Sequence, residues 1–290
     1  MHFTILHTSS PAAIMAAALR VASLDAIEAA LSAIGTAVRN LRINAEAAAA
    51  PNIFERDVER HNVLPPIAPM RAREAALQGM YPPVFVLYDF ETTGMGKTSE
   101  IRIRQIGARA ISSKTLESIG TFTTFVNPGV PTSEGAKKVC RIDAANEEYV
   151  AGLGTWREAG RRFSNWLQDM RNHNDDCPLH LIAHNGKRFD ARILTFENAR
   201  HYIDFNTFEV HSCDSIDVFK KVYPGLTSYS LGNIYQDVLG RELKGAHDAM
   251  VDVDGMWRLM KYKKDDAIAN VISNSECFRH VQKRCFATKL

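Results

Sequence analysis

The residues of this chain that could do chemistry are four acids and a histidine, carried by three short strings. Asp89 and Glu91 lie in VLYDFETTG, Asp190 ends AHNGKRFD, and His247 and Asp252 lie in GAHDAMVDVD. Carboxylate oxygens are hard ligands that favour Mg²⁺ or Mn²⁺, and these strings lack the Cys/His spacing that zinc prefers. If the three strings meet in space, they supply the inventory for two-metal hydrolysis of a phosphodiester.

The first string reads as the end of a buried strand. Residues 84–88 are β-branched, aromatic or aliphatic and lie between a proline and a turn that contains Gly94. Side chains two apart share a face of a strand, so the carboxylates of Asp89 and Glu91 can point at one spot. A cation between them would relieve their repulsion. Taken alone, the same residues also fit a solvated turn.

In the second string, residues 184–187 are predicted to form a turn that leads into a helix, and the third string is predicted to lie on a helix. Asp190 is at the start of a predicted helix over 189–201, where the helix dipole alone would explain a carboxylate. His247 and Asp252 lie on a predicted helix over 246–262, about 140° apart around its axis. We expect them to flank one edge of that helix. Without the other strings, this histidine would be interpreted as making a surface hydrogen bond.

The three strings together carry a family resemblance. D-x-E-x-T-G, H-N-x-x-x-F-D and H-x-x-x-x-D, in this order and spacing, resemble the DEDDh exonucleases of the DnaQ-like group. Within that group, TSYSLGNIYQDVLG over 227–240 and the second string are most similar to the Trex three-prime repair exonucleases. HSCDSIDVFKKVYP also resembles their preceding strand and helix. The similarity covers about residues 83–264.

The chemistry assigns a role to each of the five residues. Hydrolysis needs a nucleophilic water, neutralisation of the phosphorus centre and stabilisation of the leaving 3′-oxygen, and two cations about 4 Å apart serve all three. Asp89, Glu91, Asp190 and Asp252 are the predicted ligands of two Mg²⁺ ions, for which Mn²⁺ can substitute, and the resemblance implies that Asp89 bridges both. His247 is predicted to take the proton from the attacking water, because an imidazole pKa near 6.5 suits a base at neutral pH.

Five residues are candidates for substrate contact. Thr92, Thr93 and Met95 follow the first acids. The matching family segment holds the terminal nucleotide with backbone amides while an apolar side chain, here Met95, wedges against its base. By the same resemblance Asn185 lies near the scissile phosphate and Tyr229 in the segment that opens a nearby helix. Local structure is the alternative for each, since Asn185, for example, is a typical turn residue.

Other polar residues are assigned structural roles. Cys277, His280 and Cys285 are irregularly spaced and lack the second pair that a zinc site needs. Four further acids are expected to stay outside the chemistry, Asp214 and Asp217 as helix caps and Asp248 and Asp254 as exposed surface charges.

One loop departs from the family pattern. Residues 125–143 occupy the place of a loop that commonly ends in His-Gly-Ile or Thr-Gly-Leu, but Cys140, Arg141 and Ile142 stand there instead. Glycine is the residue that turns the backbone most freely, so its loss predicts a different turn and different substrate contacts at this position.

The order of elements predicts an α/β fold with a sheet of mixed direction. Three early strands with short connections should be antiparallel neighbours, and the later alternation of strands and helices should add parallel strands. This order fits the ribonuclease H-like fold that the resemblance implies, a mixed five-stranded sheet flanked by helices. After the first strand, the predicted elements are strands 105–111, 120–126, 179–183 and 208–213, and helices 155–173, 189–201 and others near 216, 230 and 246.

The chain is predicted to have three parts. These are a helical, alanine-rich N-terminal extension and linker over 1–80, an exonuclease domain over 81–264 and a basic, helical C-terminal tail over 265–290. Apolar residues recur at helical intervals over 12–39, but charged residues interrupt them, so no membrane span or membrane partner is predicted. The extension carries no recognisable chemistry, and we expect it to form a homo-oligomer or to dock a protein partner.

Composition fits a globular protein of a reducing compartment. Of 290 residues, 46% are hydrophobic, and the five cysteines are scattered and odd in number. This predicts an intracellular location in the cytoplasm or nucleus, while the acid-free first 24 residues leave mitochondrial import open. A formal net charge of +2 neither demands nor excludes nucleic acid, and Lys187 and Arg188 are the basic residues best placed to contact phosphates.

These residues and the resemblance imply a Mg²⁺-dependent 3′-to-5′ exonuclease that acts on single-stranded DNA ends and releases nucleoside 5′-monophosphates. RNA 3′ ends are the alternative substrate, and an RNA-trimming exoribonuclease or a polymerase proofreading subunit is the alternative enzyme. A non-catalytic nucleic-acid-binding scaffold is the alternative from another class. The intact set of four acids and a histidine argues against it, because a protein released from catalysis need not keep all five.

Overall fold

The structure of the chain is a computed structural model, and it describes residues 82–140, 144–174, 177–205 and 208–287. The helices and linker predicted over 1–80 lie outside the described residues, as do Arg141 and Ile142. Within the described ranges, no helix has both the length and the apolar character needed to cross a membrane. All five cysteines are described, and all are free thiols.

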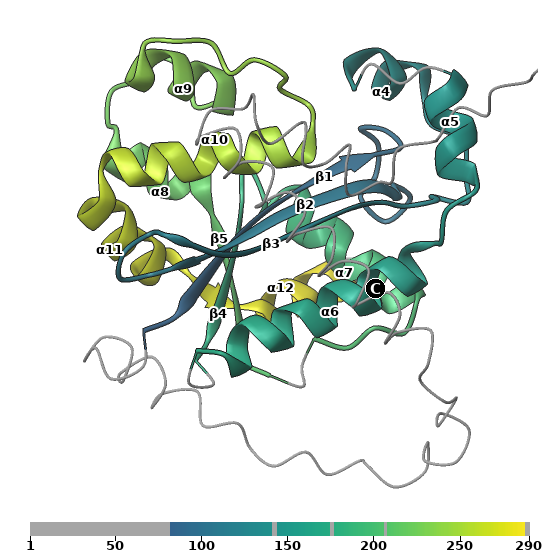
Figure 1. Ribbon diagram of the computed structural model, residues 1–290, viewed down its shortest axis with the longest axis horizontal. Helices are drawn as coiled ribbons and strands as arrows, with labels where there is room; N and C mark the ends of the chain where they lie inside the picture. Colours follow the sequence, from purple (N-terminus) through teal and green to yellow (C-terminus); the bar gives the residue numbers. More distant parts are fainter. Residues whose placement is uncertain (1–81, 141–143, 175–176, 206–207, 288–290) are drawn as a thin grey trace, which may run out of the picture. The chain divides into compact units, whose positions relative to one another are not determined.

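The sheet has mixed direction, as predicted, but it has six strands instead of five (Figure 1). The strand order is β3-β2-β1-β4-β5-β6, in which β1 pairs antiparallel with β2 and parallel with β4. The additional strand has only two residues, too few to produce a periodic signal in the sequence. The strands are β1 Val84–Thr92, β2 Ile103–Ser112, β3 Ser118–Phe125, β4 Leu179–Ala183, β5 Val210–Asp214 and β6 Glu276–Cys277.

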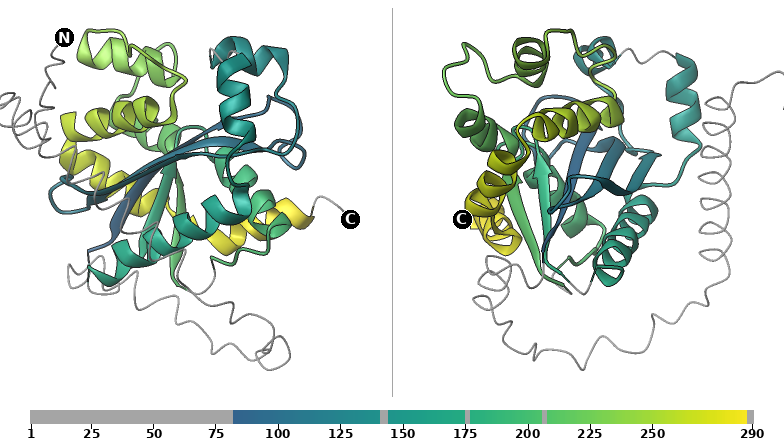
Figure 2. Two further views of the ribbon diagram at one scale, coloured as in Figure 1. Left: turned by 45° about the vertical axis from the view of Figure 1, so that its right-hand side comes forward. Right: turned by 60° about the vertical axis from the view of Figure 1, so that its left-hand side comes forward.

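Helices cover both faces of the sheet (Figure 2). One face packs against α6 (Trp156–Asn172), α7 (Asp190–Arg200) and α12 (Phe278–Ala287). The other face packs against α8 (Ser215–Val222), α9 (Leu231–Leu239), α10 (Ala249–Tyr262) and α11 (Lys264–Asn274). Two short helices, α4 (Glu134–Val139) and α5 (Ala144–Ala151), lie at the end of the sheet where β1 terminates (Figure 1).

Alternation along β1 decides where its acids point. Val86 and Tyr88 belong to the core beneath α6 and α7, whereas Leu87 belongs to the core beneath α10. Because side chains alternate across a strand, Asp89 and Glu91 share the face of Leu87 and therefore point toward α10.

A glycine allows α10 to approach this face closely. Gly107 of β2 lies opposite Asp89 in the strand register. A Cβ atom on Gly107 would lie 2.7 Å from the carbonyl carbon of Ala249, the first residue of α10. The start of α10 is thus in direct contact with the backbone of β2, beside the first acid of β1.

The segment after residue 264, predicted as a basic helical tail, is helical in α11 and α12 but packs into the two cores. Val271 of α11 is buried in the core on one face of the sheet, and Phe278, Val281 and Cys285 of α12 are buried in the core on the opposite face. The short strand β6 joins these two helices and pairs with β5. The described part of this segment therefore belongs to the same fold as the sheet.

Candidate metal-binding active site

Three carboxylates meet between β1 and α10. Asp89 and Glu91 lie on β1, and Asp252 lies in the first turn of α10. One oxygen from each of the three lies within 4.8 Å of the others. Among the described residues, Oδ1 of Asp252 is buried and has no hydrogen-bond partner. A buried acceptor without a donor is destabilising unless a cation or water supplies the missing interaction.

Asp190 joins this group from the start of α7, where a helix was predicted to begin. The strand β4 pairs with β1 only as far as Leu87, so the backbone beyond that point has no strand partner on this side. The N–H group of Phe90 instead donates to Oδ1 of Asp190 at 3.3 Å. The Asp190 side chain is buried, and its carboxylate is held beside the backbone that separates the two acids of β1.

Crowding and burial raise the pKa of all four carboxyls. Burial is the largest cause for Asp89, whose pKa is raised well above its ordinary value, and the carboxylates of Asp190 and Asp252 add to it. Burial raises the pKa of Asp190 to about 8, although backbone N–H groups act in the opposite direction. Burial also raises the pKa of Glu91 and Asp252, with His247 nearby lowering both. A divalent cation would lower the pKa of these carboxyls again, because it stabilises their ionised form.

His247 lies before α10 and not on it. The predicted helix over 246–262 begins only at Ala249, and His247 has a positive φ of 70°. Its N–H group donates to Oδ2 of Asp252 at 3.4 Å, which fixes the backbone of the histidine to a candidate metal ligand. The prediction that both residues flank one helix was therefore wrong. The imidazole is carried by an exposed loop and is accessible to water.

Asp248 and Asp254 are not the free surface charges that the sequence suggested. Asp248 is the N-cap of α10: its Oδ1 accepts from the N–H groups of Met250 and Val251, while its Oδ2 accepts from Nε2 of Gln105 at 3.2 Å. Oδ1 of Asp254 accepts from Nε and Nη2 of Arg109, at 3.0 and 2.7 Å.

These bonds attach the start of α10 to β2. They come from residues more than 140 positions apart, which is why the sequence did not reveal them. Asp248 and Asp254 therefore have structural partners and remain outside the carboxylate group.

Cys140 contacts the carboxylate group and was not predicted to do so. Its Sγ atom donates to Oε2 of Glu91 at 2.8 Å, and burial followed by this hydrogen bond raises the pKa of the thiol to about 12. The only signal in the sequence was that Cys140 stands where the family pattern has other residues. The thiol therefore remains protonated at neutral pH and acts as a donor to Glu91.

The candidate substrate residues after β1 differ in accessibility. Thr92 and Thr93 are buried, and the Thr92 hydroxyl donates to the carbonyl of Gly94. The N–H group of Thr93 donates to the carbonyl of Arg102, and its hydroxyl accepts from the Arg102 N–H. Met95 is 86% exposed. Both threonine side chains thus hold the local backbone, whereas Met95 presents a free apolar side chain.

The second string forms a loop held by several hydrogen bonds. Asn185 is exposed, has a φ of 60°, and donates its N–H to Oδ1 of Asp214 at 3.0 Å. Nε2 of His184 lies 2.9 Å from the carbonyl oxygen of Tyr229, and its Nδ1 lies 2.8 Å from the Ser215 hydroxyl. A carbonyl only accepts, so Nε2 carries the proton, in agreement with the lowered pKa that burial gives this imidazole. The loop that ends in Asp190 is thereby attached to the segment of Tyr229.

The two predicted capping acids have different roles. Asp214 caps α8 by accepting from the N–H of Ile216, as predicted. Asp217 instead pairs with Nζ of Lys187, so its assignment as a cap was wrong. The ammonium group expected to contact phosphates therefore has a carboxylate partner within the chain.

The donor set fits a hard divalent cation. All contributing atoms are carboxylate oxygens. Asp252 also has a buried oxygen, Oδ1, that receives no hydrogen bond from the part of the chain that the structure describes. Asp89, Glu91 and Asp252 have oxygens close enough to bind one ion, and Asp190 is near enough to raise the pKa of Asp89. An exposed imidazole next to such ions could accept a proton from water.

Comparison with known proteins agrees with this chemistry. A family model described as exonuclease matches residues 86–259. The chain is 29% identical over 161 residues to a PolC-type DNA polymerase III of Caldanaerobacter subterraneus, covering 56% of this chain and 10% of the relative. It is 31% identical over 138 residues to a DNA polymerase III subunit epsilon-like protein of Rhodobacter capsulatus, covering 46% of this chain and 19% of the relative. The chain thus spans a small part of both relatives.

Solved structures share the fold. E. coli exonuclease I in complex with a dT13 oligonucleotide superposes with a TM-score of 0.52 at 21% identity, covering 63% of this chain and 41% of that one. The zinc-bound form of the same enzyme with single-stranded DNA superposes with a TM-score of 0.51 at 20% identity, covering 63% and 40%. At this identity the likeness is one of fold, and it agrees with the ribonuclease H-like sheet predicted from the sequence.

Proposed function

The chain belongs to the RNase_T exonuclease family, and on this premise we propose that it is a two-metal-ion enzyme that removes nucleotides from the 3′ end of single-stranded DNA as nucleoside 5′-monophosphates. The observation that carries the proposal is the convergence of Asp89, Glu91 and Asp252 from β1 and α10, with Asp190 held beside them by the N–H of Phe90. The buried, donor-free oxygen of Asp252 supports a cation among them.

The residues of the chain divide the work of hydrolysis. Asp89, Glu91, Asp190 and Asp252 would hold two Mg²⁺ ions, with Mn²⁺ as a substitute. When bound, such ions lower the pKa of an attacking water and neutralise charge on the phosphate and the leaving oxygen. The imidazole of His247 would accept the proton that this water releases, since the loop exposes His247 to solvent while its backbone N–H, which donates to Asp252, keeps the residue beside the ligands.

Substrate placement is proposed from accessibility and from the structural neighbours. Met95 would contact the terminal base, because its apolar side chain is exposed only four residues after Glu91. Asn185 and Tyr229 would lie along the strand near the scissile phosphate, on two segments that His184 joins. Thr92 and Thr93 would act by shaping the backbone. The E. coli exonuclease I structures contain single-stranded DNA, which supports a single-stranded substrate.

Proofreading is the second candidate function, and the two polymerase relatives favour it. A proofreading enzyme removes a mismatched 3′ terminus from a primer and slows at the first paired nucleotide. An enzyme that trims free ends, as the resemblance of residues 227–240 to Trex exonucleases favours, continues to short oligonucleotides. RNA trimming is a further alternative, in which the same reaction acts on a strand of ribonucleotides.

The test uses end-labelled strands of DNA and RNA with Mg²⁺ or with a chelator. We expect a DNA strand labelled at its 5′ end to shorten one nucleotide at a time from the 3′ end, only with the metal. Asp190→Ala should abolish shortening by removing a metal ligand, whereas Asp265→Ala, which removes an exposed acid on α11, should not. If neither DNA nor RNA is shortened in a metal-dependent way, the proposal is refuted. If only RNA is shortened, the protein is an exoribonuclease.

A further inference from the structure

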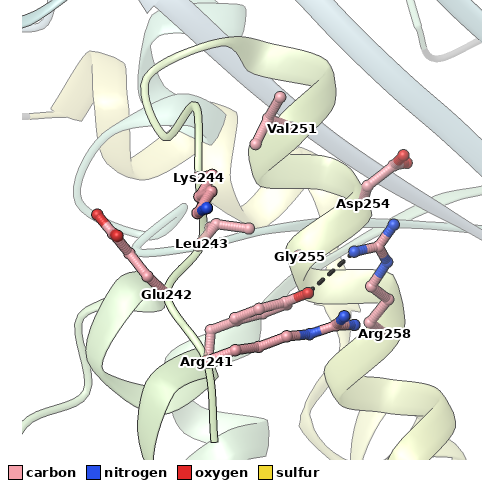
Figure 3. Close-up of a pocket in the computed structure, with 9 residues that line it drawn as sticks. Arg241, Glu242, Leu243, Lys244, Val251, Asp254, Gly255 and Arg258 are labelled. Atoms are coloured by element: carbon pink, nitrogen blue, oxygen red, sulfur yellow. Dashed lines mark hydrogen bonds between the residues drawn. The ribbon is translucent and has the colours of Figure 1, made fainter. Parts of the chain in front are cut away.

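A pocket outside the carboxylate group lies between α9 and α10. It encloses about 500 Å³ and is lined by residues of α9, of the loop that follows it and of α10, none of which is a candidate catalytic residue (Figure 3). Three of its lining residues are cations, namely Arg241, Lys244 and Arg258. The pocket therefore has a chemistry that the hydrolytic mechanism does not use.

Two guanidinium groups share one aromatic ring in this pocket. Nη1 of Arg258 donates to the hydroxyl of Tyr235 at 2.9 Å, and the guanidinium of Arg241 lies 5.8 Å from the centre of the same ring. Figure 3 shows both arginine side chains reaching the same end of the pocket, while Glu242 points to the opposite side. Like charges placed together repel unless an anion lies between them.

Two acids, Glu242 and Asp254, also line the pocket, and after the tyrosine hydroxyl, Asp254 helps to raise the pKa of Arg258. Within the described part of the chain, however, none of Arg241, Lys244 and Arg258 forms a salt bridge, and Asp254 is already bound by Arg109. Guanidinium groups bind phosphate oxygens in a planar, bidentate geometry. A phosphate group between the two arginines would satisfy their charges.

A second hollow continues the same surface along α10. It is lined by Arg241 and Arg258 again and by Trp257, Lys261 and Tyr262. The guanidinium of Arg109, which pairs with Asp254, lies 4.4 Å from the Trp257 ring centre, and the Lys261 ammonium, which pairs with Glu117, lies 4.9 Å from it. Tyr262 is 62% exposed. Cations that alternate with aromatic rings are the pattern by which proteins hold single-stranded nucleic acid without reading its sequence.

The surface begins beside the proposed active site. Lys244 precedes His247 by three residues, and Val251, which lines the first pocket, is next to Asp252. Arg258 follows Asp252 by six residues, which is about 9 Å along a helix and about 120° around its axis. A strand whose 3′ end lies at the carboxylates would therefore reach the pocket by passing about a third of a turn around the start of α10.

We propose that this surface, defined by Arg241, Lys244, Arg258, Trp257, Lys261 and Tyr262 and called here the α9–α10 strip, holds the substrate strand upstream of its 3′ end through its phosphodiester groups. The proposal rests on the proposed function and extends it to the part of the strand that is not being cut. Binding at the strip depends on charge and on stacking, so it has no sequence preference.

The first experiment measures binding without hydrolysis. A 20-nucleotide fluorescent oligothymidylate is titrated with the protein in EDTA at several salt concentrations, and its anisotropy gives the affinity. Each phosphate contact contributes about 0.7 to the slope of log K against log salt for a single strand, so Arg241→Ala with Arg258→Ala should lower that slope by about 1.4 and weaken binding at low salt by about tenfold or more. Arg241→Lys with Arg258→Lys keeps the charge and should recover most of the slope.

Arg157→Ala with Arg161→Ala is the matched control, because it removes two exposed arginines from α6 on the other face of the sheet. An unchanged slope and affinity in the strip variant, or an equal loss in this control, would overturn the proposal. Complete displacement of the strand by millimolar inorganic phosphate at constant ionic strength would also overturn it, in favour of a small-anion site.

The second experiment separates the strip from the active site. The p-nitrophenyl ester of thymidine 5′-monophosphate has no upstream strand, so the variant lacking Arg241 and Arg258 should hydrolyse it at the wild-type rate. The same variant should degrade the 20-nucleotide strand more slowly at low protein concentration. An equal loss on both substrates would place the arginines at the reaction centre and refute the strip. If the wild-type protein cleaves neither substrate, the proposed function fails, while the binding measurement still decides whether the strip exists.

Discussion

The contact between Gly107 and α10 predicts a large effect from the smallest possible side chain. In Gly107→Ala, the new Cβ would lie 2.7 Å from the carbonyl carbon of Ala249 and 2.8 Å from its oxygen. Carbon atoms in contact are ordinarily about 3.5–4.0 Å apart, so the start of α10 must move away from β2 by about 1 Å. Asp252 follows Ala249 by three residues in the same turn and would move with it, away from Asp89 and Glu91.

A displacement of that size matters because metal ligands must lie within about 0.2 Å of their proper distances. Misplacement of reacting groups by about 1 Å can slow an enzyme by about 10²-fold. We therefore expect Gly107→Ala to need more Mg²⁺ for half-maximal activity and to cleave a labelled strand about 10²-fold more slowly at saturating Mg²⁺. Overpacking should also lower the free energy of unfolding by about 1–3 kcal/mol.

The assay is the initial rate of strand shortening against Mg²⁺ concentration, with thermal unfolding of the same preparations. Gly232→Ala is the matched control, because nothing lies within 4 Å of the added Cβ and this glycine is on the exposed side of α9. It should leave the Mg²⁺ dependence unchanged. A Gly107→Ala protein that is folded and has the wild-type rate and Mg²⁺ dependence would refute the idea that this contact sets the position of Asp252.

Three further predictions concern single groups of the active site. His247→Ala should slow hydrolysis by about 10²–10⁴-fold with little change in strand affinity, as single-turnover rates and anisotropy would reveal, and an unchanged rate would remove the imidazole from the mechanism. Without metal, the raised pKa of Asp190 means that the native state is stabilised when this carboxyl is protonated: the contribution is fully present below the unfolded pKa near 4 and is lost as pH rises through about 8. Thermal unfolding in EDTA should show this loss of stability with rising pH, and Mg²⁺ should oppose the loss. Asp190→Asn should make the stability less dependent on pH over this range. Cys140→Ala removes one hydrogen-bond donor from Glu91 and should reduce activity by no more than about tenfold, since such a bond contributes about 0.5–1.5 kcal/mol. Cys140→Ser keeps a donor and is the control. A hundredfold loss in Cys140→Ala would give the thiol a direct part in the chemistry.

The sheet and its acids could be predicted because their signals are local. An apolar run followed by Asp89 and Glu91 is readable within ten residues, and strand alternation then places both acids on one face. The helix start at Asp190 is equally local. For these residues, the pattern of side chains and the geometry of a strand or a helix are sufficient.

The conformation around His247 was not predictable because it depends on distant partners. Helical spacing continues through residue 246, which favours an earlier helix start. The structure instead begins α10 after Asp248, whose carboxylate caps the helix while accepting from Gln105, a residue 143 positions away. His247, which directly precedes this cap, has a φ of 70°.

The contact of Cys140 with Glu91 has a similar origin. It joins two segments 49 residues apart through one hydrogen bond, and no periodicity records it. The packing of the C-terminal segment had a local signal that was not used: Phe278, Val281 and Cys285 recur at the spacing of one helix face, which is typical of a helix that packs on a core.

The strand β6 has a consequence for how the chain can be shortened. It pairs with His211 and Ser212 and so occupies the backbone donors and acceptors on the outer side of β5. An exposed row of such groups is a template for pairing with another chain. A version cut after residue 264 would lose β6 together with Phe278 and Val281, and it would present both an unpaired edge and uncovered apolar surface. We expect that protein to aggregate, even though every candidate catalytic residue would still be present.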